Sequence, residues 1–158
     1  MTRKHRGFTL VELVITVAII GVIALMATPL VEVTLKRQKE TELRTALRQI
    51  RTAIDDYRQA VRDKRIEAPA DASGYPPDLG VLAGGVVDKT SPDGKNIYFL
   101  RRLPRDPFAP DAKSDAAASW GKRAYESPPD DPREGKDVFD VYSRSPLVGL
   151  NGVPYREW

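Results

Sequence analysis

A single acidic residue interrupts an apolar run near the start of the chain. Residues 8–31 read FTLVELVITVAIIGVIALMATPLV, and Glu12 is the only charged side chain among them. As a helix this run would be about 36 Å long, which is enough to cross a bilayer. A carboxylate in hydrocarbon costs on the order of 3 kcal/mol and is kept mainly where it has a partner or a function. Glu12 is therefore the first candidate for a functional residue.

The position of Glu12 leaves two interpretations open. Because Glu12 lies near one end of the run, its carboxylate could reach the membrane interface and remain solvated. Alternatively, the carboxylate pairs with a positive charge inside the apolar environment. No basic residue lies within residues 8–31, so this second interpretation needs a positive charge that is created after synthesis.

The residues around Glu12 resemble a known processing signal. Residues 3–12 read RKHRGFTLVE, which is similar to the class III signal of type IV prepilins and pseudopilins. The resemblance implies that a membrane-embedded aspartyl peptidase cuts between Gly7 and Phe8 and that the new Phe8 amine is methylated. It also implies that Glu12 pairs with the Phe8 amine of a neighbouring subunit during assembly. Each charge would then offset the cost of burying the other.

Gly21 and Pro29 lie inside the same run. Glycine has a low helix propensity, and proline removes one backbone hydrogen bond and clashes with the preceding turn. Both residues are common in membrane helices, so simple tolerance is one interpretation. The resemblance to pilins implies another, in which Gly21 and Pro29 give the helix the flexibility to loosen as the subunit moves from the bilayer into a fibre.

The composition argues against an enzyme. The chain has no cysteine, which excludes disulfides, thiolate metal sites and a thiol nucleophile. Its one histidine, His5, lies in the segment expected to be removed, so the mature chain would have no histidine for a catalytic triad or a metal site. The sequence also has no phosphate-binding loop or dinucleotide fingerprint. We predict no catalytic residues, no metal ligands and no enzymatic activity.

The net charge gives no support for nucleic-acid binding. The chain carries a formal charge of +3, with 25 basic and 22 acidic residues. This excess equals the three basic residues Arg3, Lys4 and Arg6 in the expected leader. We therefore predict no nucleic-acid partner.

Three other side chains have a structural and a functional interpretation. Asp106 precedes a proline, so we expect it to form a turn rather than act as an acid. Trp120 and Trp158 could stack on a ligand, but we expect a small domain with few large apolar residues to use them in its core.

A long helix is predicted to position the N-terminal residues. Apolar residues recur every three or four positions, as expected for one face of a helix: Leu43, Leu47, Ile50, Ile54, Tyr57 and Val61. We expect the helix to continue to about Ile66 and to pack on a globular domain through this stripe. Its opposite face carries six arginines: Arg44, Arg48, Arg51, Arg58, Arg62 and Arg65. We expect a solvated face, with pairing to acidic surfaces of adjacent subunits as an alternative.

Four segments are predicted along the chain. They are a leader over 1–7 that is removed, a transmembrane and polymerisation helix over 8–31, an amphipathic continuation over 32–67, and a small periplasmic domain over 68–158. In that domain, we expect strands over 123–126 and 138–143, with 154–158 as a weaker third. The predicted fold class is α+β, a long N-terminal α-helix packed on a small antiparallel sheet, as in pilins.

The order of segments in the second half is most like that of the major pseudopilin of type II secretion. The similar segments are LPRDPF at 103–108 and FDVYS at 139–143. The resemblance would also imply a calcium-binding loop with several aspartates after the second segment. Residues 144–152 instead read RSPLVGLNG, which offers no carboxylate, whereas calcium prefers several. We therefore predict no cofactor and no calcium site, and a loop held by the packing of Leu147, Leu150, Tyr155 and Trp158.

These inferences predict a structural subunit, a pseudopilin of a periplasmic pilus-like fibre that drives type II protein secretion. The alternative is a minor type IV pilin of a pilus or a DNA-uptake fibre. The resemblance implies a single-pass protein of the bacterial inner membrane with a cytoplasmic N-terminus and a periplasmic C-terminal domain. It also implies the partners: copies of the chain in a fibre, other pseudopilins, the prepilin peptidase and the inner-membrane assembly platform.

Overall fold

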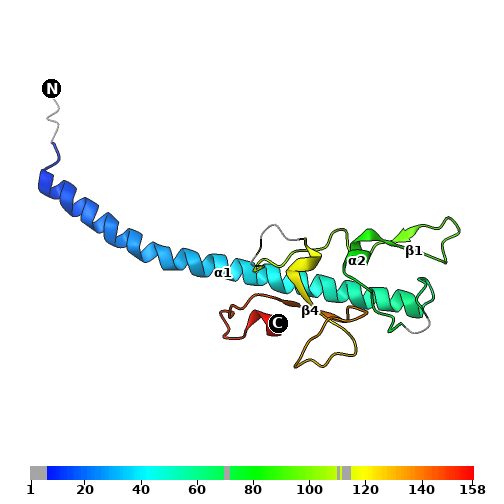
Figure 1. Cartoon of the computed structure of the whole chain (residues 1–158). Coiled ribbons are helices and arrows are strands. Elements are labelled where there is room, and N and C mark those ends of the chain that lie inside the picture. The colour runs from blue at the N-terminus through cyan, green and yellow to red at the C-terminus, as the bar shows by residue number, and fades with distance from the viewer. Residues whose placement is uncertain (1–6, 70–71, 110, 112–114) are drawn as a thin grey trace, which may run out of the picture. The chain divides into compact units, whose positions relative to one another are not determined.

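The chain forms one long helix followed by a small domain of short elements (Figure 1). This computed structural model describes residues 7–69, 72–109, 111 and 115–158, and for residues 25–30 it describes the backbone. The long helix, α1, spans Leu10–Arg62. The chain divides into two compact units, residues 1–38 and 39–158, so α1 contributes its first part to one and its second part to the other.

The first unit contains the beginning of α1. In the part of this unit that the structure describes, the large apolar side chains are exposed, including Phe8, Ile15 and Ile23. None of the helices searched among the described residues is long and apolar enough to qualify as a membrane span. The span predicted over 8–31 includes residues 25–30, whose side chains lie outside the described part, and it stays a prediction.

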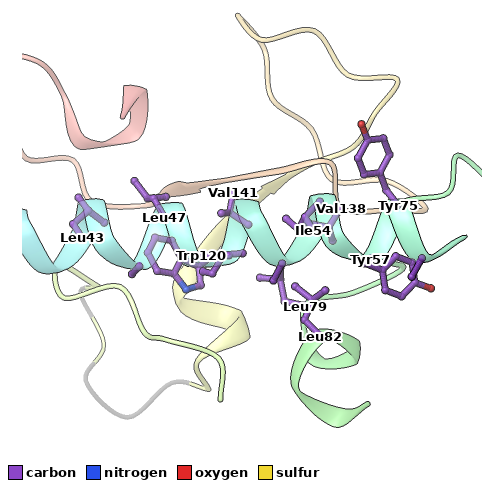
Figure 2. Packing of buried hydrophobic residues seen from close by; sticks show 14 of the residues in the cluster. Leu43, Leu47, Ile54, Tyr57, Tyr75, Leu79, Leu82, Trp120, Val138 and Val141 are labelled. Atoms are coloured by element: carbon purple, nitrogen blue, oxygen red, sulfur yellow. The ribbon is translucent and has the colours of Figure 1, made fainter. Parts of the chain in front are cut away.

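The second unit packs around the predicted apolar stripe of α1. Figure 2 shows the stripe residues Leu43, Leu47 and Ile54 along one side of the helix. They are buried together with Ile50 and Tyr57. The residues that pack against this stripe come from the later part of the chain: Tyr75, Leu79, Leu82, Trp120, Val138, Val141 and Tyr155. The predicted core face of the helix is therefore confirmed, and so is the core position of Trp120, whereas Trp158 is partly buried at the edge of the core.

Helix α1 ends a few residues before the predicted position. It ends at Arg62, and Lys64 has a φ of 57°, in the left-handed region. The backbone N–H groups of Arg65 and Ile66 donate to the carbonyl oxygen of Ala60 at 2.9 and 3.3 Å. These bonds satisfy a carbonyl at the end of the helix in the manner of a C-terminal cap. No proline or glycine marks this point in the sequence, which is why the predicted end was too late.

Two small antiparallel sheets complete the second unit. In the first, β1 (Val86–Val87) pairs with β2 (Asn96–Ile97). In the second, β3 (Trp120–Arg123) pairs with β4 (Asp140–Ser143), with Trp120 opposite Ser143 and Arg123 opposite Asp140. The long helix packed with small antiparallel sheets confirms the predicted α+β class and is consistent with a pilin-like fold.

The strand predictions were correct in part. Strand β4 lies within the predicted range 138–143, whereas β3 begins three residues earlier than the predicted range 123–126 and shares only Arg123 with it. The third predicted strand is wrong, because Tyr155–Glu157 forms a 3₁₀ helix, η2, and Pro154 makes an isolated bridge with Val148. The short elements α2 (Gly80–Gly84) and η1 (Ala117–Ser119) precede β1 and β3.

Candidate assembly site

Glu12 lies in the first turn of α1, where Thr9 caps the helix. The backbone N–H of Glu12 donates to the Thr9 hydroxyl at 3.2 Å, and the N–H of Leu13 donates to the Thr9 carbonyl at 3.1 Å. Thr9 and Glu12 stand in the spacing of a capping box, a signal in the sequence that the prediction of this helix did not use. A carboxylate in the first turn also interacts favourably with the helix dipole. Glu12 thus has a local role in starting the helix as well as the predicted role in assembly.

Gly7 and Phe8 precede the helix and are accessible. Phe8 is 78 % exposed, and apart from the chain neighbours of Gly7 no described heavy atom lies within 4 Å of the position that a Cβ on Gly7 would take. The structure therefore places Gly7, Phe8 and Glu12 within six residues, all exposed, at the beginning of α1. Residues 1–6 of the predicted leader, including His5, lie outside the described residues.

Helix α1 is continuous through Gly21 and Pro29. Apart from its chain neighbours and the backbone of the helix itself, no described heavy atom lies within 4 Å of the position that a Cβ on Gly21 would take, so no close packing among the described residues requires a glycine there. The side chain of Pro29 lies outside the described part. The predicted flexibility at these two residues stays a prediction.

The first half of α1 presents a large uncovered apolar surface. Single exposed apolar residues are ordinary in soluble proteins, but contiguous apolar patches of this kind mark contacts with proteins or membranes. The exposed side chains are Phe8, Leu10, Val11, Leu13, Val14, Ile15, Val17, Ile19, Ile20, Val22, Ile23, Val31, Val33 and Leu35. We define these residues as the apolar helix surface, and Glu12 is the one acidic residue among residues 8–31.

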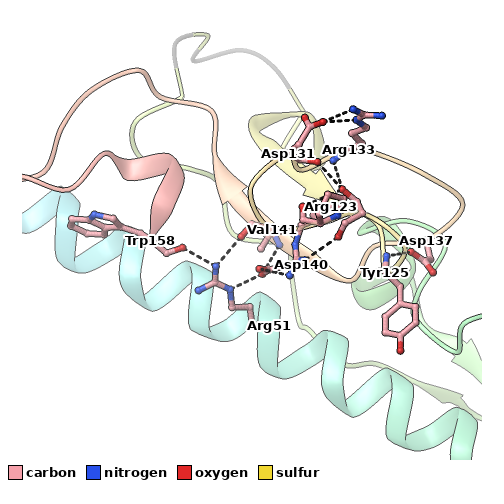
Figure 3. Close-up of polar contacts among 11 residues, drawn as sticks. Arg51, Arg123, Tyr125, Asp131, Arg133, Asp137, Asp140, Val141 and Trp158 are labelled. Atoms are coloured by element: carbon pink, nitrogen blue, oxygen red, sulfur yellow. Dashed lines mark hydrogen bonds and ion pairs between the residues drawn. The ribbon is translucent and has the colours of Figure 1, made fainter.

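The arginine face of α1 differs from the solvated face that we expected. Arg51 Nε donates to Asp140 Oδ1 at 2.8 Å, and its Nη2 donates to the carbonyl oxygens of Val141 and Trp158 at 3.1 and 2.8 Å (Figure 3). Arg58 donates to the Tyr75 hydroxyl. These arginines bind α1 to other segments of the second unit. Periodicity along the helix could not indicate these contacts.

Two more arginines of the predicted charged face, Arg65 and Arg44, also make contacts. Arg65 Nη2 lies 2.6 Å from Asp88 Oδ2, and this contact is the main reason that the pKa of Asp88 is lowered from 3.8 to about 2. The Thr90 hydroxyl and N–H also donate to Asp88, at 2.6 and 2.9 Å. The Arg44 guanidinium lies 4.3 Å from the ring centre of Trp158, a cation–π contact.

The loop that follows β4 is held only in part as we predicted. Tyr155 is buried in the core and Trp158 packs against the core. Leu147 and Leu150 are 55 % and 45 % exposed, so their packing does not hold it. Instead, Glu40 Oε1 accepts the Leu150 N–H at 2.7 Å and the Tyr155 hydroxyl at 3.0 Å. Glu40 is 5 % exposed. The sequence patterns did not single out Glu40, although an acid on the stripe side of α1, three residues before Leu43, was a signal that could have drawn attention to it.

Asp106 is more than the turn former that we expected. Its Oδ1 accepts the Phe108 N–H at 2.8 Å, which is the predicted turn contact. Its Oδ2 also accepts the Ser143 hydroxyl at 2.6 Å, and its own N–H donates to the Ser119 hydroxyl at 3.1 Å. Asp106 is 2 % exposed and joins the 103–108 segment to β4 and η1.

The described residues contain no group of three or more histidine, cysteine or acidic side chains that could hold a metal ion. The prediction that the chain lacks a calcium site stays a prediction.

Comparison with known proteins bears on the N-terminal residues. The model of a protein family described as the prokaryotic N-terminal methylation motif matches residues 2–28 of the chain. No curated protein and no solved structure matches the chain.

The match indicates what kind of site the N-terminal residues form. The methylation motif is of the type IV prepilin kind, so the chain carries a signal for peptidase processing and for assembly into fibres. It covers Gly7, Phe8, Glu12 and Gly21, and the α+β fold that follows is consistent with a pilin-like protein. The motif supports a type IV pilin-like protein in general and does not separate pseudopilins from pilins.

Proposed function

We propose that this chain is a pseudopilin, a structural subunit of a periplasmic pilus-like fibre that drives type II protein secretion. The observation that carries the proposal is the methylation motif over residues 2–28 together with the uncovered apolar helix surface, which overlaps the motif. A fibre built from such helices buries this surface between subunits. Removing exposed apolar area from water in this way favours assembly. The absence of cysteine from the chain and the FDVYS segment favour a pseudopilin over a minor pilin.

The proposed role of the N-terminus follows from charge. Cutting between Gly7 and Phe8 creates a cationic amine, and Glu12 supplies the opposite charge to the Phe8 amine of a neighbouring copy. Removing one partner of a buried ion pair typically costs about 3–5 kcal/mol because the other charge is left unpaired. The pair therefore selects one register between neighbouring helices. Before assembly, the uncut chain is proposed to lie in the inner membrane with residues 39–158 in the periplasm.

The first experiment measures the mass of the protein extracted from membranes of cells with and without the prepilin peptidase. We expect the loss of residues 1–7 and the gain of a methyl group only when the peptidase is present. Gly7→Val should keep the chain uncut. Recovery of a chain that still starts at Met1 in peptidase-positive cells would refute the proposal.

The second experiment separates processing from assembly. Glu12→Gln should be cut normally and should fail to enter fibres that are recovered from the cell envelope. Glu42→Gln is the matched control, since Glu42 is also an exposed glutamate of α1 and should assemble normally. Loss of exoprotein secretion in the deletion strain, restored by the unaltered chain, is expected for a pseudopilin. Normal secretion with loss of surface pili or of DNA uptake would assign the chain to the alternative, a minor type IV pilin.

A further inference from the structure

A groove runs along α1 in the second unit. It has a volume of about 550 Å³ and lies between the helix and the last residues of the chain. It is lined by Arg44, Leu47, Arg48, Arg51, Thr52, Asp55, Asn151, Val153, Glu157 and Trp158. We call this the α1 groove. Its volume falls within the range of roughly 300–1,000 Å³ that is typical of ligand sites, so it can accept a short peptide segment.

One end of the α1 groove is positively charged. Arg44 and Arg48 are four residues apart, and Arg51 is three residues further on, so the three guanidinium groups are neighbours on the helix surface. Like charges at this spacing destabilise a helix unless a counter-charge relieves them. Arg51 is neutralised by Asp140. No acidic residue stands three or four positions before or after Arg48 in the sequence, and no ion pair of Arg44 or Arg48 occurs within the described part of the chain.

The acidic residues of the groove wall leave this end positive. Asp55 is seven residues beyond Arg48, about 10 Å along the helix. Glu157 Oε1 lies 3.8 Å from Nε of its neighbour Arg156. The end of the groove at Arg44 and Arg48 therefore favours an anionic occupant.

The same chain presents a segment with the opposite charge. The connection between β3 and β4 includes residues 126–134, ESPPDDPRE, in which all four acidic residues are exposed. Asp131 pairs with Arg133, which Figure 3 shows on this connection, and Glu134 lies 3.6 Å from Lys122 Nζ. Glu126 and Asp130 form no ion pair with any described residue. We call residues 126–134 the acidic loop.

The acidic loop is suited to docking as a peptide. Three of its nine residues are proline, at 128, 129 and 132, and proline restricts the backbone before binding. A segment that is already restricted loses less conformational entropy when it binds. Its two unpaired carboxylates are separated by Ser127-Pro128-Pro129, so their Cα atoms are at most about 14 Å apart. Arg44 and Arg48 are about 6 Å apart along the helix, and their long side chains can spread to reach both carboxylates.

We propose that the acidic loop of one copy of this chain docks into the α1 groove of a neighbouring copy, with Glu126 and Asp130 facing Arg44 and Arg48. Charge complementarity identifies the occupant as a second copy. The contact joins two different surfaces of the same chain, and such heterologous contacts generate open helical assemblies when they do not close into a ring. The inference rests on the proposed function, because it describes how neighbouring subunits meet in the fibre.

The first test uses the lack of native cysteine. The 158-residue chain with Arg48→Cys and Asp130→Cys is expressed in cells that process it, and fibres recovered from the cell envelope are oxidised. We expect disulfide-linked dimers and higher multimers. The control pair is Arg48→Cys with Asp93→Cys, since Asp93 is an equally exposed acid in the turn between β1 and β2. Equal cross-linking by both pairs, or none by the first pair in polymerised chain, would overturn the contact.

The second test exchanges the charges. Arg48→Glu and Asp130→Lys should each lower the yield of fibre about fivefold, the size expected for an exposed ion pair turned into a repulsion. The combination of the two should restore most of the yield, and high salt should weaken the unaltered contact. If the double variant is no better than the single variants, the pairing is wrong.

The two proposals fail in distinguishable ways. Mass spectrometry of each variant reports the cut before Phe8 independently of the groove. A processed chain that polymerises without the specific cross-link overturns the docking contact and leaves the proposed function standing. An unaltered chain that is neither cut nor polymerised overturns both.

Discussion

The Tyr155 hydroxyl donates a hydrogen bond to Glu40 Oε1 at 3.0 Å, across 115 positions of the sequence. The same oxygen accepts the Leu150 N–H at 2.7 Å. Tyr155 itself is fully buried and stacks on Phe108, with ring centres 4.2 Å apart. One carboxylate of α1 therefore holds both the loop over 144–153 and the 3₁₀ helix η2 in place.

Glu40→Ala should weaken the second unit substantially. The substitution leaves the Leu150 N–H and the Tyr155 hydroxyl without their acceptor, and hydrogen bonds to charged groups contribute about 1.5–3 kcal/mol each. We expect the free energy of unfolding to fall by about 3 kcal/mol. Chemical denaturation of the detergent-solubilised chain, followed by the fluorescence of Trp120 and Trp158, measures it. Glu42→Ala is the control and should change the value by less than about 0.5 kcal/mol; equal effects would refute the role of Glu40.

The ionisation of Tyr155 should make the second unit sensitive to alkali. Burial, and then the hydrogen bond to Glu40, raise the pKa of Tyr155 from 10.0 to about 12. A pKa raised in the folded state gives stability that is fully present below pH 10 and is lost as the pH rises from about 10 to about 12. Tyr155→Phe should flatten this part of the pH profile, although it is less stable at neutral pH. Ultraviolet titration of the phenolates should show a late-ionising component that becomes smaller in the variant. Part of it should remain, because burial also raises the pKa of Tyr57 and of Tyr75.

The long helix and its core face could be predicted from sequence because both depend on local periodicity. Leu43, Ile50 and Tyr57 recur at helical spacing, and the burial of such a stripe does not depend on which segment covers it. The alternating segment around Val141 gave the position of β4 for a similar reason. The predicted position of strand β3 was three residues too late, because Trp120 and Gly121, which begin the strand, lie in no alternating pattern.

The contacts that join distant segments could not be predicted in this way. The bond from Glu40 to Tyr155 and the bonds from Arg51 to Asp140 and Trp158 depend on how the last residues of the chain cross α1. Periodicity identified Arg51 as part of a charged face of the helix. Such a face is expected to be solvated, and only the tertiary structure shows which of its arginines has a partner. At the N-terminus the signal is local. Glu12 could be singled out as the one charge in an apolar run, and Gly7 and Phe8 through the resemblance of residues 3–12 to the prepilin signal.

Arg51→Ala should loosen the attachment of the last residues to α1. The variant removes the bonds to Asp140, Val141 and Trp158, but the side chain of Arg51 is 40 % exposed, so solvent weakens the ionic contribution. We therefore expect a loss of about 1–2 kcal/mol in the free energy of unfolding. Arg62→Ala, an exposed arginine on the same helix, should have a much smaller effect. Faster hydrogen exchange at Val141 and η2 in Arg51→Ala alone would localise the change; exchange that rises equally in both variants would contradict it.

The pair of Arg65 and Asp88 should make the stability of the second unit depend on pH in the acidic range. The Arg65 contact and the Thr90 hydrogen bonds lower the pKa of Asp88 from 3.8 to about 2. A lowered pKa gives stability that is present above pH 4 and is lost as the pH falls from about 4 to about 2. Asp88→Asn should therefore reduce the slope of stability against pH in this window. Asp93→Asn, in the neighbouring turn, should leave the slope unchanged, and identical slopes for both variants and the unaltered chain would contradict the assignment to Asp88.

Substitutions at two isoleucines of α1 should affect folding and assembly separately. Ile50 is fully buried in the core, whereas Ile15 is 53 % exposed on the apolar helix surface. Ile50→Ala leaves a cavity and should cost about 2–5 kcal/mol of unfolding free energy. Ile15→Ala should leave this free energy within about 0.5 kcal/mol, since more than half of the Ile15 side chain is exposed in the single chain, yet it should lower the yield of fibre. Denaturation and fibre yield measured on both variants decide the matter, because a loss of monomer stability in Ile15→Ala would mean that the first half of α1 is covered within its own chain.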